Sequence, residues 1–118
     1  MAILNVHSGP TFDAGASESD VLAIGTDYIV GLICPADWTP AVVSVLISAQ
    51  GDNYLDLFDG KGEEFIFNVT PGVAIAVDPY ILLMAAYIRL RSGTRKNPVP
   101  QEAERRFYMI GTSKLALA

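Results

Sequence analysis

The stretch Val43-Ser44-Val45-Leu46-Ile47-Ser48 decides the fold class, because β-branched residues alternate in it with two serines and a leucine. Successive side chains of a β-strand point to opposite faces, so a period of two predicts a strand with one face in a core. The same period recurs on both sides of this stretch. The further strands that it predicts are residues 21–24, 28–34, 54–58, 65–69, 73–77, 87–91 and 105–110.

Turn-forming residues separate these runs. Gly, Pro, Asp and Asn occur at residues 35–37, 50–53, 59–62 and 70–72, and these residue types accept the backbone of a tight turn. About eight antiparallel strands joined by such turns predict an all-β fold, either a β-sandwich or a small closed barrel.

Two longer connections favour the sandwich. Residues 78–86 and 92–104 suit strands that cross between two sheets, an arrangement typical of a jelly roll. Within the first connection, Asp78 is placed to cap a single helical turn with Pro79 at its first position. We therefore expect an antiparallel β-sandwich of jelly-roll type.

A chain of 118 residues has the size of one domain with a single core. We expect one sandwich over residues 1–118, with an N-terminal arm at 1–16 and a C-terminal tail at 111–118. No apolar run approaches the roughly 20 residues that cross a bilayer, so no membrane partner is expected. The first residues lack the basic and apolar stretches of a secretory signal, which predicts synthesis in the cytoplasm.

Charge is divided unequally along the chain. Residues 1–60 carry eight acids and no Lys or Arg, a charge of −8, whereas residues 61–118 carry eight basic and five acidic residues, a charge of +3. Opposed patches of this kind fix register at a contact, so one prediction is association with a differently charged neighbour or with another copy. The alternative is that both signs mix on the folded surface.

The sequence offers little for catalysis. His7 is the only histidine and Cys34 the only cysteine, so neither a structural zinc site nor a disulfide within one chain is expected. A solvent-exposed or contact role is expected for His7, and Cys34, which ends an apolar run, is expected in the core. We predict no catalytic residue, no metal and no cofactor.

Two pairs of acids leave an enzymatic alternative open. Asp56 with Asp59, or Glu63 with Glu64, would supply the carboxylates of a small glycosidase. The simpler interpretation is that these acids flank a turn at residues 60–62 and face solvent.

Basic and aromatic residues supply the candidates for binding. Arg89 and Arg91 share one strand face and are expected to form a positive stripe that contacts protein carboxylates. A sequence pI of about 4.6 argues against nucleic acid as a partner. Trp38 and Tyr54 are candidates for stacking on a sugar, with a core position favoured for Trp38.

Several pieces of the sequence are similar to a known family. They are residues 35–39 (PADWT), Gly51-Asp52 after the strand that ends at Ser48, residues 57–59 (LFD) with Gly62, residues 77–79 (VDP), and residues 88–94 (IRLRSGT) followed by Pro98-Val99, Gln101 and Arg105 or Arg106. The most specific piece is LRSGT at 90–94 followed by PVPQ at 98–101. Over roughly residues 17–110 the chain resembles small β-sandwich virion proteins of tailed bacteriophages.

This resemblance implies a jelly-roll or carbohydrate-module-like sandwich without a catalytic motif. Relatives of known role are capsid decoration, or cement, proteins on the exterior of the head. The implied partners are the major capsid protein and further copies of the chain, as a homodimer or homotrimer, and the implied location is the capsid exterior of the virion. Alternatives are a carbohydrate-binding module and a connector or tail protein of the virion. The candidate partner contacts are Ile3, Leu4, Arg89, Arg91, Arg95, Lys96, Gln101, Leu115 and Leu117.

Overall fold

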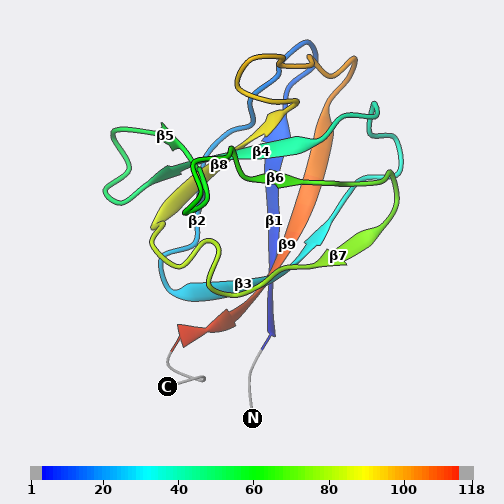
Figure 1. Cartoon of the computed structure of the whole chain (residues 1–118). Helices are drawn as coiled ribbons and strands as arrows, with labels where there is room; N and C mark the ends of the chain where they lie inside the picture. Colours follow the sequence, from blue (N-terminus) through cyan, green and yellow to red (C-terminus); the bar gives the residue numbers. More distant parts are fainter. Residues whose placement is uncertain (1–3, 115–118) are drawn as a thin grey trace.

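Two antiparallel β-sheets pack face to face in the computed structural model, which describes residues 4–114 (Figure 1). Sheet I has the strand order β1-β9-β3-β7, and sheet II has the order β2-β8-β4-β5, with β6 also paired to β4. The strands are β1 (Leu4–Phe12), β2 (Leu22–Ala23), β3 (Asp27–Ile33), β4 (Val43–Ser48), β5 (Leu55–Asp56), β6 (Ile66–Phe67), β7 (Ala74–Ala76), β8 (Tyr87–Ser92) and β9 (Arg105–Ser113). No helix in this part of the chain is long and apolar enough to cross a membrane.

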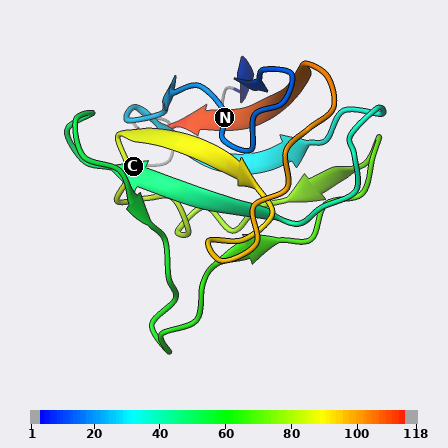
Figure 2. The ribbon, with the colours of Figure 1, turned by 90° about the horizontal axis from the view of Figure 1, so that it is seen from above.

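The core lies between the sheets and is built by the alternation along the central strands. From sheet II, Val45 of β4 lies opposite Leu90 of β8, and both are fully buried. From sheet I, Leu32, Phe107 and Met109 are fully buried in the same cluster. The two layers are seen on edge in Figure 2. The period of two therefore directs one face of each sheet into a shared core.

The strand order interleaves the two halves of the chain. β9 lies between β1 and β3, and β8 lies between β2 and β4. β5 and β6 pair with different ends of β4, at Leu46–Ile47 and at Val43–Ser44, so they share one strand position that segment 57–65 interrupts. Figure 2 shows this segment projecting away from the two layers. When β5 and β6 are counted as one strand, the strand orders of the two sheets are those of a jelly roll. The predicted fold is therefore confirmed.

The two ends of the described chain differ from the prediction. Residues 4–12 were expected in an arm, but they form β1, which pairs with β9 from Leu4↔Thr112 to Phe12↔Arg105. Residues 111–113 were expected in the tail, but they extend β9. These segments pair with each other across about a hundred residues of sequence, and periodicity within a short window does not reveal such a partner. The predicted arm and tail are therefore wrong for residues 4–12 and 111–113.

The connection at residues 78–86 forms successive turns. The carboxylate of Asp78 accepts a hydrogen bond from the amide of Tyr80, and its carbonyl accepts one from the amide of Ile81. Asp78 thus caps the segment as expected. Leu82 and Ala85 of this segment are buried, so it packs against the core rather than forming a separate layer.

Candidate functional site

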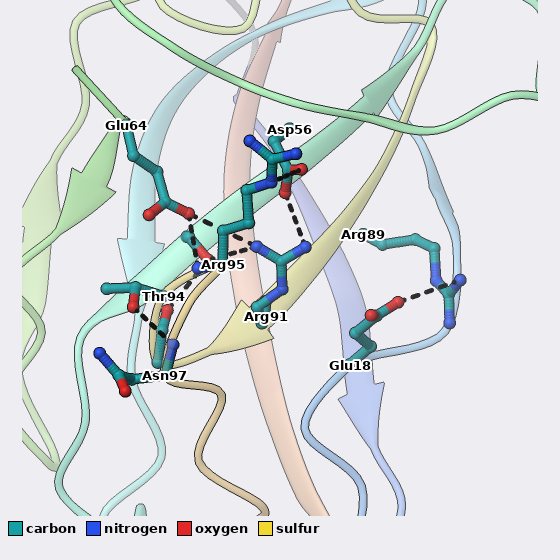
Figure 3. Close-up of polar contacts among 10 residues, drawn as sticks. Glu18, Asp56, Glu64, Arg89, Arg91, Thr94, Arg95 and Asn97 are labelled. Atoms are coloured by element: carbon teal, nitrogen blue, oxygen red, sulfur yellow. Dashed lines mark hydrogen bonds and ion pairs between the residues drawn. The ribbon is translucent and has the colours of Figure 1, made fainter.

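The outer face of sheet II carries an ion-pair cluster around Arg91 (Figure 3). Arg91 Nη2 lies 2.6 Å from Asp56 Oδ1, and Nη1 lies 3.4 Å from Glu64 Oε2. Arg91 is only 7% exposed. Its position follows from the strand pairing, because Arg91 lies opposite Ser44 of β4, and β5 and β6 pair with the other edge of β4.

Arg95 closes the cluster from the loop that follows β8. Its Nε lies 3.3 Å from Asp56 Oδ2, and its backbone amide donates to Glu64 Oε2 at 2.9 Å. Two guanidinium groups therefore face two carboxylates, as Figure 3 shows. The cluster joins β8, β5 and the end of segment 57–65. Its charges balance, so this part of the sheet is not a free basic patch.

Arg89 is compensated in the same way. Arg89 Nη1 lies 3.4 Å from Glu18 Oε1, and Nε donates to the carbonyl of Ser19. The expected positive stripe of Arg89 and Arg91 is therefore wrong as a free surface, because both side chains contact acids of their own chain. The spacing of two residues between these arginines correctly placed them on one face of the strand. It could not show which acids the fold brings beside them.

Folding brings acids of the first half of the chain beside arginines of the second half. The ion pairs Glu18–Arg89, Asp56–Arg91, Asp56–Arg95 and Asp37–Arg105 each join an acid of the first half to an arginine of the second half. This follows from the topology, since the jelly roll places late strands between early ones. The alternative in which both signs mix on the folded surface is confirmed for these groups.

The acids of the two pairs considered for a glycosidase have different contacts in the structure. Asp56 and Glu64 both contact Arg91. Asp59 accepts hydrogen bonds from the amides of Lys61 and Glu63, and so holds the turn of segment 57–65. The simpler interpretation, in which these acids flank a turn and face solvent, holds for the exposed Asp59. It is wrong for Asp56 and Glu64, whose side chains are mostly covered and pair with Arg91.

Gln101 is fully buried, so its expected role as a partner contact is wrong. Its Oε1 accepts from the amide of Thr39 at 2.9 Å, and its Nε2 donates to the carbonyl of Thr39 and to Ser92 Oγ. Arg105 Nε also reaches Oε1 at 3.3 Å. One side chain thus fixes the loop after β3, the end of β8 and the start of β9. No local pattern marks this role.

Trp38 is a core residue, and the sugar-stacking assignment for it is wrong. It is 2% exposed, its ring meets those of Phe12 and Phe107 in edge contacts, and Nε1 donates to the carbonyl of Ala41 at 3.1 Å. Burial of a large aromatic ring with its N–H satisfied is a strong packing anchor.

Tyr54 remains available for a ligand. It is half-buried, and the guanidinium of Arg89 lies 6.0 Å from its ring centroid. A shallow hollow of about 210 Å³ is lined by residues on both sides of Tyr54 in the sequence, but not by Tyr54 itself: Ser48, Ala49, Gln50, Asp52, Asn53 and Leu55. This volume is below the roughly 300–1,000 Å³ typical of small-molecule sites.

The other candidates fall into two groups. Leu4, Arg95 and Lys96 are exposed, so they are accessible to a partner. Ile3, Leu115 and Leu117 lie outside the described residues.

The two potentially reactive side chains, His7 and Cys34, are both engaged within the fold. His7 Nε2 lies 2.7 Å from Oδ2 of the buried Asp27, and the amide of Asn5 lies 3.4 Å from the same carboxylate. This contact ties β1 to β3. A solvent-exposed or contact role was expected for His7, and the structure shows a contact within the chain. Cys34 is buried as expected, and its burial raises the pKa of the thiol to about 11. A thiol with such a pKa is a poor nucleophile at neutral pH.

An apolar surface that sequence reasoning missed covers the outer face of sheet I. The strand register places eight apolar side chains on this face, which we call the apolar face: Leu4, Val6, Tyr28, Ile33, Ala74, Ala76, Tyr108 and Ile110. Leu4, Val6 and Tyr108 are 64%, 66% and 39% exposed, and Ala74 and Ala76 are exposed as well. The alternate residues of β3 and β9 enter the core, so this arrangement leaves both faces of sheet I apolar.

Two cations lie at opposite ends of the apolar face. Arg106 bonds to Ser8 Oγ and Thr11 Oγ1 at one end. Lys114 lies at the other end, where Nζ donates to the carbonyl of Gly25 and lies 5.9 Å from the ring of Tyr28. The eight residues of the face itself carry no charge.

No protein family matches this chain, and no curated protein is similar to it.

Proposed function

We propose that this protein is a structural virion protein of a tailed bacteriophage that decorates the capsid and stabilises it by binding the shell of the major capsid protein. The observation that carries the proposal is the apolar face of sheet I. The resemblance of residues 17–110 to small virion proteins supplies the kind of partner. In this proposal the protein acts without catalysis, on the exterior of the capsid.

The size and chemistry of the apolar face support a protein partner. Neighbouring strands lie about 4.8 Å apart, and along β9 the face extends about 14 Å, from the level of Tyr108 to that of Thr112, which pairs with Leu4 and Tyr28. The four strands therefore present roughly 200–260 Å². An apolar patch of a few hundred Å² on a folded domain is often functional, which fits an interaction site. Removing it from water would stabilise the complex through the hydrophobic effect.

The construction of the sandwich suits a part that must keep its shape under load. The cluster around Arg91 and the hydrogen bonds of Gln101 both join segments that are distant in sequence. A rigid binding surface loses little conformational entropy on association. Binding to the shell would in turn stabilise the fold by mass action.

The test is the resistance of capsids that lack the protein to heat. We expect added wild-type protein to raise the temperature at which such capsids open. Tyr108→Glu, at the centre of the apolar face, should abolish this shift, because it would bury a charge in the contact. Tyr80→Glu is the matched control, since Tyr80 is 74% exposed and lies in the connection at 78–86.

Two outcomes would contradict the proposal. The first is that capsids open at the same temperature with and without the wild-type protein. The second is that Tyr108→Glu protects them as well as Tyr80→Glu does. Saturation at only a few copies per particle would instead support a connector or tail protein.

A second candidate function is carbohydrate binding at Tyr54. The observation that favours it is that Tyr54, a half-buried ring, lies in sequence between Asn53 and Leu55, which both line the hollow together with Gln50 and Asp52. Aromatic faces with adjacent polar groups are typical of sugar sites. Binding on a glycan array that Tyr54→Ala removes would support this function, and silence of the wild-type protein at high concentration would exclude it.

A further inference from the structure

The edges of the two sheets differ in length. β2, β5 and β6 each span two residues, and β7 spans three. β1 spans nine residues, from Leu4 to Phe12. Short edge strands offer little main chain to another molecule, whereas a long one is a template for a further strand. β1 is therefore the edge that needs an explanation.

The C-terminal part of β1 already has a hydrogen-bond partner on the side that faces away from β9. At Thr11, the amide donates to Asp20 Oδ1 at 2.8 Å, and the carbonyl accepts from the amide of Asp20 at 2.9 Å. The register with β9 shifts between Ser8 and Thr11. The segment that precedes the shift, Leu4 to Ser8, pairs regularly with β9 on one side.

The free side of Leu4–Ser8 has no backbone partner within residues 4–114. In an antiparallel ladder, alternate residues direct their N–H and C=O groups away from the neighbouring strand. The usual protections of an edge are lacking here, because the segment contains neither lysine nor proline nor an acid. Its two large side chains, Leu4 and Val6, are among the most exposed apolar groups of the described chain.

We propose that β1 pairs with β1 of a second copy of this chain, antiparallel and about a twofold axis at Val6. The segment Leu4–Ser8 is self-complementary in this register. Val6 lies opposite its own copy, Asn5 opposite His7, and Leu4 opposite Ser8. A pair of β-branched residues is a favourable cross-strand pair. No two like charges meet, because His7, the one residue of the segment that could carry a charge, lies opposite Asn5.

Pairing of β1 with β1 of a second copy fits this edge better than pairing of β1 with a different strand of that copy. Pairing of β1 with β7 of another copy would engage only the three residues of β7 and would continue into an open chain of copies. The twofold pairing closes on itself and leaves no long edge free. The two copies of sheet I would then form one continuous eight-stranded sheet.

The dimer would also strengthen the binding to the shell proposed above. Only this consequence, and not the dimer itself, rests on the proposed function. The apolar faces of the two copies would lie side by side on the joined sheet and together present roughly 400–500 Å², at least about half of the ~800 Å² per partner of a standard interface. Two linked faces would also bind a shell more tightly than one, because the second contact is intramolecular.

The test is the mass of the purified full chain in the absence of capsids, measured by sedimentation over a wide range of concentration. We expect a dimer. Val6→Lys should raise its dissociation constant roughly tenfold or more, because two ammonium groups would then lie opposite each other. Met84→Lys is the matched control, since Met84 is 64% and Val6 66% exposed and Met84 lies outside sheet I.

Engineered cysteines test the register, and the buried Cys34 gives little background. Opposed residues of neighbouring strands have Cα atoms about 5 Å apart, which a disulfide spans. Val6→Cys should therefore form a covalent dimer under mild oxidation. Leu4→Cys should not, because the two copies of residue 4 would be about 14 Å apart.

The proposal fails if the wild-type chain is monomeric at every concentration. It also fails if Val6→Lys leaves the dimer intact, or if Leu4→Cys cross-links as readily as Val6→Cys. Since no capsid is present, a negative result here leaves the shell-binding proposal standing, and failure to bind capsids leaves the dimer standing.

Discussion

Arg91 of β8 lies 2.6 Å from Asp56 of β5, although these two strands do not pair with each other. The contact passes over β4, which lies between them. It therefore fixes the edge strand and segment 57–65 to the centre of sheet II. A charged group that is 7% exposed persists only with partners of this kind.

Removal of the cation from this cluster should destabilise the fold. We expect Arg91→Met to lower the free energy of unfolding by about 3 kcal/mol, because Asp56 and Glu64 lose the guanidinium they share. Arg91→Lys keeps the charge without the planar fork, and should cost less. Urea unfolding of the three proteins measures this difference, and a loss below about 1 kcal/mol for Arg91→Met would contradict the role of the cluster.

Gln101 should be more important for stability than any exposed amide. Gln101→Ala leaves the amide and carbonyl of Thr39 and the hydroxyl of Ser92 without their partner, and we expect a loss of about 2–4 kcal/mol. Gln50→Ala is the matched control, because the side chain of Gln50 is exposed. Thermal unfolding should separate the two variants clearly. Equal midpoints would show that the bonds of Gln101 contribute nothing net.

We expect replacement of the Thr112 side chain to stabilise the fold. Its Oγ1 is buried and has no hydrogen-bond partner among residues 4–114. Valine has the same shape without the hydroxyl, so Thr112→Val should raise the free energy of unfolding by about 1 kcal/mol. Chemical denaturation tests the prediction, and a lower midpoint for the variant would indicate that the hydroxyl has a partner.

Cys34 should resist modification in the folded protein. Burial raises the pKa of its thiol from 9.0 to about 11, so the thiolate fraction near pH 8 falls roughly a hundredfold. We expect slow reaction with a thiol reagent in buffer and fast reaction in denaturant. Labelling in buffer at the rate of the unfolded chain would contradict this prediction.

The same shift gives the sign of a pH effect on stability. The folded pKa of Cys34 lies above the unfolded one, so the neutral thiol contributes fully to the free energy of unfolding below about pH 9. This contribution is lost as the pH rises from about 9 toward 11, because only the unfolded chain then releases the proton. A Cys34→Ala variant should show a smaller loss over this range.

The central strands could be predicted from the sequence, because alternation of side chains with a period of two is a local signal. The alternation of Val43–Ser48 and of residues 105–110 predicted the central strands of both sheets, and β4 and β9 include those residues. β1 was missed because its pairing with β9 joins the two ends of the chain. Alternation marks a candidate strand, but it does not show which other strand it pairs with.

The candidate sites were less accessible to sequence reasoning for the same reason. The face shared by Arg89 and Arg91 followed from their spacing, whereas the acids beside them come from distant segments. Gln101 looked like an exposed loop residue, yet the loop folds back over the end of the sandwich and buries it. The apolar face arises only when four strands are placed in register.

The most direct test of the proposed function is co-sedimentation of the purified protein with capsids that lack it, read as copies bound per major capsid subunit. We expect saturable binding at a simple ratio, retained by Tyr80→Glu and lost in Tyr108→Glu. The absence of binding by the wild-type protein, or equal binding by both variants, would contradict it.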